Sequence, residues 1–369
     1  MTDDETAALK KVWNDYLDGL KSAGEQLFRT TTPSDQTTAA EGLRHLSRLT
    51  RLGLVAMMEY ADPDFPVLAR YVDEVTKFGC DNPDTIYQRA LINGAHRYRI
   101  VGTRNSIDYL SFITAKPGEN GRQDQIGQID TKTLKVGSEG TFEITLSPER
   151  SGENWLLMTP ETKSVSVRQT YLNRATEKPA DLRIERLGEA VTPPLLTLEA
   201  VKAKLAAASG YTQYCATLFT DWTESYLAHP NTLPPADQDA CLRAGGDPNI
   251  YFYRSFWSLA PDEALAVHIA HIPQCDTWNL QVDNYWQESM DHRYFRSSVN
   301  KHTAWLDADG GVTIVIAHRD PGHPNWLSTA GHRLGHFAMR WIRAAEHVDP
   351  VARLISFDEA RAIHGKAKA

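Results

Sequence analysis

The sequence predicts an α+β protein, with a helical N-terminal region, a mostly antiparallel β core of the sandwich or jelly-roll type, and a helical insertion. Three observations predict it: helical spacing of apolar residues near the start, short alternating runs that follow, and a second set of such runs after a helical stretch. We therefore expect a helical region at 1–78, a first β domain at 79–190, a helical insertion and loop at 191–249, a second β domain at 250–345, and a C-terminal tail at 346–369.

The helical elements follow from the spacing of apolar residues. Residues 7–30 and 38–60 place Leu and aromatic side chains three and four positions apart, which is typical of amphipathic helices. The sequence TTTPSD between them has the Thr, Pro, Ser and Asp of a loop and an N-cap. A third short helix is expected near 66–77.

The β elements follow from a change of period. Between residues 84 and 186 the short runs TIYQRALI, HRYRIVG, YLSFITA, GTFEITL and KSVSVRQTYL alternate and are separated by Gly, Asn, Pro or Asp. GEAVTPPLLT is the expected linker, followed by one helix that stops at Gly210, a second at 211–226, and a long surface loop at 229–249. Strand patterns return after Ile250. No self-similar period is evident, so we expect no internal repeat.

The composition excludes several classes of protein. In 369 residues, 41% are hydrophobic and 23% are charged, which indicates a folded globular chain. A net charge of -8 and the lack of a basic stripe argue against nucleic acid, and no apolar run is long enough for a membrane span. The acidic start does not resemble a secretory signal, and four widely separated cysteines indicate reduced thiols, so we expect a cytoplasmic protein.

Several segments together resemble a bacterial family of domains of unknown function, the one numbered 1214. They are AEGLRHLSRL, DNPDTIYQRALINGAHRYRIVGTRNSIDYLSF, NWLLMTPETKSVSVRQTYL, and the long stretch from WNLQVDNYWQESMDHRYF to RDPGHPNWLSTAGHRLGHFAMRW. They span roughly residues 43–341. The resemblance implies a fold with a β-sandwich core and implies no particular activity.

The densest group of chemically capable residues is HRDPGHPNWLSTAGH. His318 and Asp320 leave a predicted strand and enter a turn that leads to His332. A His oriented by a carboxylate suits general acid-base catalysis near neutral pH. The alternative is that Asp320 caps the turn and that the His side chains are structural. The three residues also have the composition of a two-His, one-carboxylate metal triad, but their spacing argues against one, so we assign no metal ligands.

Two further groups are candidates for the same site. Asp84 and Tyr87 at the start of the first β domain could act as an acid-base pair, or could cap a turn and pack inward. Five residues are expected to shape the pocket or, alternatively, to form structural pairs and packing contacts: Trp286, Asp291, Arg293, Asn325 and Trp326. The half-buried Arg168 is expected to pair with a carboxylate of the protein, with anion binding as the alternative.

No nucleophile elbow, phosphate-binding loop or dinucleotide-binding motif is present, so the residues favour a cofactor-free hydrolase or lyase that acts on a small organic substrate by His/Asp catalysis. Two alternatives stay open: a non-catalytic protein that binds carbohydrate or another small ligand, and a metal-dependent enzyme that uses His318, Asp320 and His332. The expected partner is a small molecule, with a homo-oligomer left open.

Overall fold

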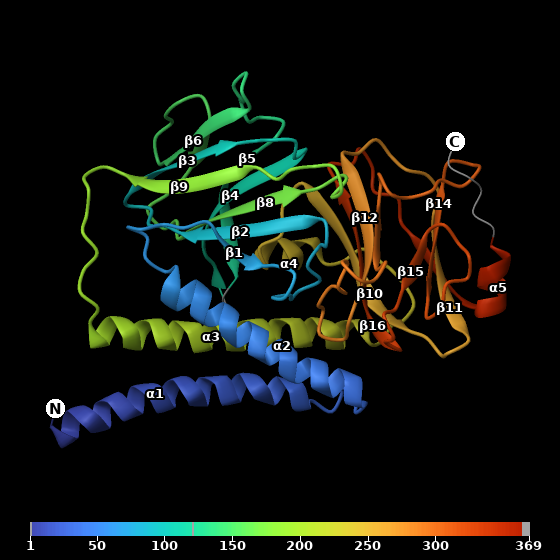
Figure 1. Cartoon of the computed structure of the whole chain (residues 1–369), viewed down its shortest axis with the longest axis horizontal. Helices are drawn as coiled ribbons and strands as arrows, with labels where there is room; N and C mark the ends of the chain where they lie inside the picture. The colour runs from blue at the N-terminus through green and yellow to red at the C-terminus, as the bar shows by residue number, and fades with distance from the viewer. Residues whose placement is uncertain (1, 120–121, 364–369) are drawn as a thin grey trace. The chain divides into compact units, whose positions relative to one another are not determined.

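The computed structural model describes residues 2–119 and 122–363 and divides the chain into two compact units (Figure 1). Unit 1 comprises Met1–Thr76, Ile86–Tyr171 and Glu177–Thr220, and unit 2 comprises Lys77–Thr85, Leu172–Thr176 and Asp221–Ala369. Helices and antiparallel strands are both abundant, which confirms the α+β prediction. In the part of the chain that the structure describes, no helix has both the length and the apolar character needed to cross a membrane.

The N-terminal helices of unit 1 lie where the apolar spacing predicts them. Helix α1 (Asp3–Gly24) begins at a capping box between Thr2 and Glu5 and continues as a 3-10 turn, Glu25–Phe28. Helix α2 (Gln36–Leu54) is capped by Asp35 and runs into a π-helical turn, η2 (Val55–Glu59). Apolar side chains of these helices pack around Tyr16, Leu205 and Ala208.

The helix expected near 66–77 was a wrong prediction. Residues Ala69–Val72 form strand β1, which pairs antiparallel with β2 (Thr85–Leu91). Pro66 and the Asp73 turn flank this short run, and Asp73 accepts hydrogen bonds from the backbone N–H groups of Val75 and Thr76. A run of six residues between two such breakers is too short for a stable helix, so pairing with β2 decides its conformation.

Two sheets form the β sandwich of unit 1. The first has the order β1-β2-β8-β4-β5 and the second β7-β6-β3-β9. Their inward faces meet in a core that includes Tyr98, Ile100, Phe112, Ile144 and Val167. The remaining strands are β3 (Arg97–Thr103), β4 (Tyr109–Pro117), β5 (Gln123–Asp130), β6 (Thr141–Ser147), β7 (Trp155–Leu157), β8 (Ser164–Thr170) and β9 (Asp181–Leu187).

The expected helix stop at Gly210 was also wrong. Helix α3 (Leu198–Tyr226) runs unbroken through Gly210, and its last residues, 221–226, belong to unit 2. A glycine inside a helix costs about 1 kcal/mol. Burial of Ala208, Thr212 and Cys215 on either side offsets that cost. The loop expected at 229–249 contains the short helix α4 (Gln238–Arg243), which is capped by Asp237.

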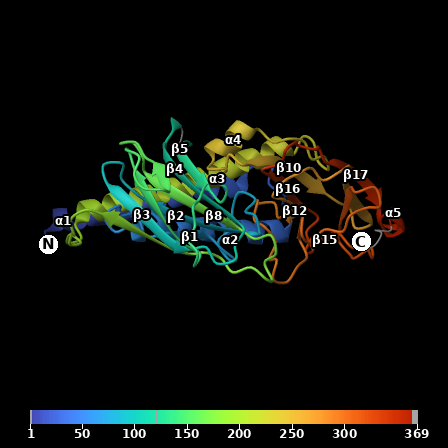
Figure 2. The same ribbon diagram turned by 90° about the horizontal axis from the view of Figure 1, so that it is seen from above.

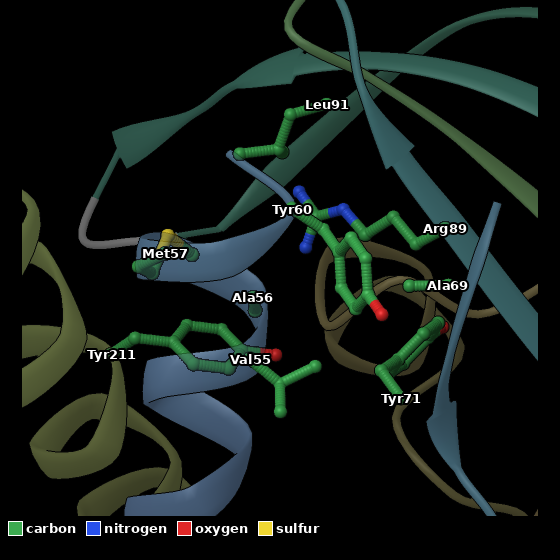
Figure 3. Close-up of a pocket in the computed structure, with 9 residues that line it drawn as sticks. All are labelled: Val55, Ala56, Met57, Tyr60, Ala69, Tyr71, Arg89, Leu91 and Tyr211. Atoms are coloured by element: carbon green, nitrogen blue, oxygen red, sulfur yellow. The ribbon is translucent and has the colours of Figure 1, made fainter. Parts of the chain in front are cut away.

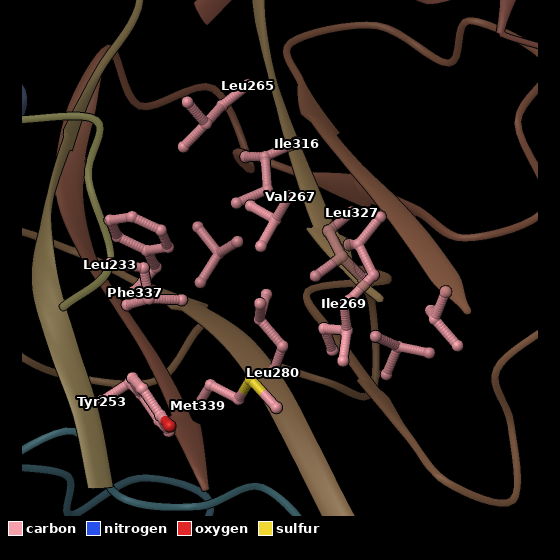
Figure 4. Close-up of a cluster of buried hydrophobic side chains, with 14 of the residues drawn as sticks. Leu233, Tyr253, Leu265, Val267, Ile269, Leu280, Ile316, Leu327, Phe337 and Met339 are labelled. Atoms are coloured by element: carbon pink, nitrogen blue, oxygen red, sulfur yellow. The ribbon is translucent and has the colours of Figure 1, made fainter. Parts of the chain in front are cut away.

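Unit 2 is a second sandwich, with sheet orders β10-β16-β12-β13 and β15-β14-β11-β17. In the first of these sheets β10, β16 and β12 lie side by side (Figure 2). Figure 4 shows the core between the two sheets, which contains Tyr253, Val267, Leu280, Phe337 and Met339. The strands are β10 (Ile250–Ser258), β11 (Glu263–Ile269), β12 (Thr277–Asp283), β13 (Ser298–Asn300), β14 (Val312–Ala317), β15 (Trp326–Ser328), β16 (Leu334–Ile342) and β17 (Val351–Ser356).

The region expected to be a C-terminal tail contributes to this sandwich. Strand β17 pairs with β11 over six residue pairs, and helix α5 (Phe357–Ala362) follows it with a capping box at Ser356. Ile355 and Ala360 pack with Ala264 and Val315 on the outer face of the second sheet. Residues 364–369 of the expected tail lie outside the described residues.

The two sandwiches have the same topology, so the expectation of no internal repeat was wrong. Adding eight to each strand number turns the order β2-β8-β4-β5 into β10-β16-β12-β13 and β7-β6-β3-β9 into β15-β14-β11-β17. The pairs β6–β7 and β14–β15 are both parallel. Strand β1 is the one addition in the sheets of unit 1. The fold is therefore a tandem repeat of one sandwich.

A buried asparagine confirms this equivalence at the level of atoms. Asn154 and Asn325 each begin the tripeptide Asn-Trp-Leu. The side-chain oxygen of Asn154 accepts from Lys135 N at 2.7 Å, and that of Asn325 accepts from Trp305 N at 2.8 Å. Their amide nitrogens donate to the carbonyls of Lys135 and Glu143 in one unit and of Trp305 and Thr313 in the other. The tripeptide is thus a sequence signal of the repeat.

Candidate functional site

The candidate site lies on the outer face of the first sheet of unit 2. Strand β12 alternates, so that Trp278, Leu280 and Val282 enter the core while Asn279, Gln281 and Asp283 point to the opposite face. Strand β16 alternates in the same way and places His336 and Arg340 on that face. All of these polar side chains are buried. Other parts of unit 2 must therefore cover a polar sheet face.

The cover comes from three segments of unit 2. Asp81 accepts a hydrogen bond through its backbone carbonyl from Gln281 Nε2 at 2.8 Å. At the end of α3, Thr223 Oγ1 lies 3.0 Å from His336 Nε2 and accepts a hydrogen bond from Gln287 Nε2 at 3.1 Å. Residues 77–82, the loop after β12, and the last turns of α3 thus enclose a network of charged and amide side chains.

Most charges in this network have partners. Lys77 Nζ donates to Ser289 O, Ser289 Oγ and Met290 O at 2.8, 2.9 and 3.1 Å. The Asp81 carboxylate accepts from Ser289 N and Oγ at 3.0 and 2.8 Å. Arg340 donates to Gln281 Oε1 at 2.7 Å and to the Cys80 carbonyl. These bonds hold the cover on the sheet and satisfy buried groups that would otherwise be costly.

Asp283 differs from its neighbours. Its side chain is fully buried, and Oδ1 accepts a 2.7 Å hydrogen bond from Gln281 Nε2. Oδ2 has no hydrogen-bond partner among the described residues. Burial, and then the negative charge of Asp81, raise the pKa of Asp283 to about 7, against the opposing charge of Arg340. This carboxyl can therefore take up and release a proton near neutral pH.

Arg254 on β10 is the second group with unmet hydrogen-bonding capacity. It is 7% exposed, and its Nε and Nη1 atoms have no hydrogen-bond partner in the described part of the chain. The guanidinium lies 5.0 Å from the Trp222 ring centroid and 5.5 Å from that of Phe252. Its charge interacts with that of Asp283, although no hydrogen bond joins the two.

His336 is held neutral beside this arginine. Burial, and then the positive charge of Arg254, lower the pKa of His336 to about 3. The ring packs edge-on against Phe256 and Tyr226 at centroid distances of 5.3 and 5.8 Å. At neutral pH the imidazole is therefore uncharged and forms a hydrogen bond with Thr223. It carries no additional proton that it could give to a substrate as a general acid.

Two residues at the edge of the network have left-handed backbone conformations. Cys80 has a φ of 56° and Gln287 a φ of 57°, and Cys80 N donates to Gln287 O at 2.7 Å. Such conformations in residues other than glycine cost on the order of 1–3 kcal/mol and cluster at functional sites. Burial, and then the charge of Asp283, raise the pKa of the Cys80 thiol well above its usual value, so the thiol stays protonated.

The residues predicted around the turn at 318–332 make structural contacts. His318 Nδ1 lies 2.8 Å from Thr329 Oγ1, and its Nε2 lies 3.3 Å from Leu259 O. His332 Nδ1 lies 2.9 Å from Thr329 O. The exposed Asp320 accepts a 2.7 Å hydrogen bond from Gly322 N. The two histidines therefore meet at Thr329, while Asp320 caps its own turn. That they transfer protons stays a prediction.

The residues predicted to shape a pocket make separate structural contacts. Asn325 joins backbone segments, and Trp326 Nε1 donates to Ala317 O at 3.1 Å. Asp291 and Arg293 form an exposed ion pair with two side-chain hydrogen bonds. The hydrogen bonding from Arg293 lowers the pKa of Asp291 to about 2. Trp286 is 4% exposed, with its ring against Tyr285.

Asp84 and Tyr87 belong to different units. Asp84 Oδ2 accepts a 3.0 Å hydrogen bond from Asn300 Nδ2 in unit 2. Tyr87 lies in unit 1, where the Arg168 guanidinium sits 5.7 Å from its ring centroid. Among the residues from 2 to 119 and 122 to 363, no three His, Cys, Asp or Glu side chains are arranged to hold a metal ion, and the set His318, Asp320 and His332 is not such a group.

Neither Asp283 nor Arg254 was among the site residues predicted from the sequence. The segment TWNLQVD alternates apolar and polar residues, a pattern that is typical of a strand with one face in water. The available signal was the number of amides and charges on that supposedly wet face, namely Asn279, Gln281 and Asp283.

The comparisons with known proteins show the family. The crystal structure of an uncharacterized protein from Burkholderia cenocepacia matches with 46% sequence identity and a TM-score of 0.92, covering 94% of this chain and 97% of that chain. The VPA0106 protein from Vibrio parahaemolyticus matches at 10% identity and a TM-score of 0.49, over 92% of this chain and 100% of that one. No curated protein matches the chain. Residues 258–346 match the model of DUF1214, a protein family of unknown function, and with the 46% identical relative this shows that the chain belongs to the DUF1214 family.

Proposed function

We propose that the buried face of β12 and β16 binds a small organic anion and transfers a proton to or from it, as a hydrolase or lyase without an organic cofactor. One observation carries the proposal. Asp283, with a pKa of about 7 and an unpartnered Oδ2, interacts electrostatically with Arg254, whose Nε and Nη1 are also unpartnered. Buried polar groups normally have partners, and unmet ones are expected where a ligand supplies them.

The two groups are chemically suited to different parts of one ligand. A guanidinium presents a planar fork of donors that fits a carboxylate. The rings of Trp222 and Phe252 beside it favour an apolar body on the same ligand. A carboxyl with a pKa near the working pH is suited to general acid-base catalysis. In this proposal Arg254 orients the substrate and Asp283 moves the proton.

Asp283 could perform the proton transfer that either reaction class requires. In a lyase reaction, ionised Asp283 would take a proton from the carbon next to the bound carboxylate, and a leaving group would depart with the bond electrons. In a hydrolase reaction, the same carboxylate would take a proton from the attacking water, whose oxygen bonds to the electrophilic carbon. The bond from that carbon to the leaving group would then break, and protonated Asp283 would return the proton to the leaving group. We place the access route past Trp222 and Tyr226 on α3, because these two side chains are only half-buried.

The test is a panel of small carboxylic acids that are larger than acetate and carry short apolar substituents, incubated with the protein at pH 7. Ligand-observed NMR reports binding, and the appearance of product signals reports turnover. We expect Arg254→Met to lose binding, and Asp283→Asn to bind but not to turn over. Arg333→Met, which changes an arginine of unit 2 outside the network, is the matched control and should retain both.

The outcomes separate the proposal from its alternatives. A panel acid that binds through Arg254 and emerges unchanged would indicate a non-catalytic binding protein. Turnover that survives Asp283→Asn, or binding that survives Arg254→Met, would contradict the proposal outright, as would the absence of binding across the panel.

A further inference from the structure

Unit 1 contains a pocket that the proposed function does not use (Figure 3). Its volume is about 20 Å³, and its walls come from η2, β1, β2 and α3. A water molecule needs roughly 10–15 Å³ on this scale, so the pocket holds one or two water-sized groups and admits only a very small ligand. Apolar side chains, including Val55, Met57 and Leu91, form much of the lining.

The pocket contains a cation without a counter-charge. Arg89 extends from β2 toward the helical wall that carries Met57 (Figure 3). Its Nε is buried and has no hydrogen-bond partner among the described residues. No Asp or Glu lines the pocket, and Arg89 forms no ion pair with a residue in the described ranges. Arg89 is only half-buried, but its Nε has lost its hydrogen bond to water, and an anion bound to the guanidinium would supply that hydrogen bond.

Two independent features support a ligand here. The wall formed by Val55 and Met57 is π-helical, and such turns occur frequently at functional sites. In addition, β2 is the repeat equivalent of β10, so Arg89 and Arg254 stand on equivalent strands of the two sandwiches. The Nε of each arginine is buried without a hydrogen-bond partner among the described residues. Tyr60, at 43% exposed, borders the pocket and provides a route from solvent.

We propose that this pocket binds a small monovalent carboxylate of the size of formate or acetate. Its oxygens would accept hydrogen bonds from the Arg89 guanidinium, and its carbon end would face the apolar wall. The pocket suits a ligand with one negative charge and few atoms, because its lining contains one cation and its volume is small. This site is separate from the Arg254 cluster and does not depend on the function proposed for it.

The experiment measures binding of ¹³C-labelled acetate to the whole protein by NMR line broadening at constant ionic strength. We expect binding to weaken at least about tenfold in Arg89→Met, which removes the charge-assisted hydrogen bonds. Arg150→Met, an exposed arginine of unit 1, is the control and should bind like the wild type. Arg254→Met should also bind, which distinguishes this site from the cluster in unit 2.

A second variant keeps the test decisive if Arg89→Met fails to fold. Ala56→Leu fills the pocket while leaving Arg89 in place, and we expect it to abolish acetate binding. Circular dichroism checks that each variant is folded. The proposal is overturned if the NMR signal of acetate does not broaden in the presence of the wild-type protein. It is also overturned if acetate binds Ala56→Leu as it binds the wild type, or if neutral acetamide binds as well as acetate.

Discussion

Gln281 donates a 2.7 Å hydrogen bond to Asp283, two positions further along the same strand, and both side chains are fully buried. Gln281 also donates from the same nitrogen to the Asp81 carbonyl and accepts from Arg340. One amide therefore connects the titratable carboxyl to the covering segment and to the neighbouring strand. The predictions below follow from this network and from the repeat.

Asp283 should make the stability of unit 2 fall as pH rises. Its pKa in the folded protein is about 7, above the value of about 3.9 for an unfolded chain. Between these values the folded state holds a proton that the unfolded state has lost, so unfolding becomes easier by about 1.4 kcal/mol per pH unit. In urea unfolding between pH 4.5 and 6.5, Asp283→Asn should lose the Asp283 contribution. Because the opposite contribution of His336 acts in the same window, the stability of this variant should rise more steeply with pH than that of the wild type. The exposed control Asp262→Asn should retain the Asp283 contribution, and equal slopes in the two variants would refute the role of Asp283.

His336 should have the opposite dependence. Its folded pKa of about 3 lies below the unfolded value near 6.5, so only the unfolded state gains a proton between those values. Stability is then lost as pH falls through this window, by about 1.4 kcal/mol per unit. The variant His336→Gln should lose less stability than the wild type between pH 6.5 and 4.5. His229→Gln, at an exposed position of unit 2, should behave like the wild type.

The paired asparagines should stabilise their units in the same way. Asn154→Ala and Asn325→Ala each remove three buried hydrogen bonds, and each should lower the free energy of unfolding by about 2–4 kcal/mol. Hydrogen exchange should speed up at the amide of Lys135 in the first variant and of Trp305 in the second. Faster exchange at both amides in both variants would contradict a local effect of each asparagine.

The histidines of the 318–332 turn can be tested against their predicted catalytic role. Because His318 and His332 both bond to Thr329, His318→Ala and His332→Ala should each lower the free energy of unfolding by about 1–2 kcal/mol. Binding of carboxylic acids at Arg254 should be unchanged. Loss of turnover with an unchanged melting temperature would instead support the general acid-base role predicted for these histidines and the carboxylate of Asp320.

The sequence alone determined the local elements and the fold class. Apolar spacing and the capping residues Thr2 and Asp35 place α1 and α2, and alternating runs between turn residues place the strands, because these signals act within a few residues of chain. The same locality explains the errors. Pairing with β2 made 69–72 a strand, and packing on both sides of Gly210 kept α3 continuous. The strand order that the two sandwiches share was not predicted, because it arises from pairing between distant segments. The tripeptide Asn-Trp-Leu is a local trace of it in the sequence.

The candidate site was decided by tertiary structure. Asp283 and Asn279 look like residues on a wet strand face until residues 77–82, from a distant part of the sequence, cover them. Burial then raises the pKa of Asp283 and leaves Arg254 with unmet donors, and neither property exists in the isolated strands. The sequence thus supplied the alternation of β12 and β16, while desolvation by a remote segment gave their polar face its chemistry.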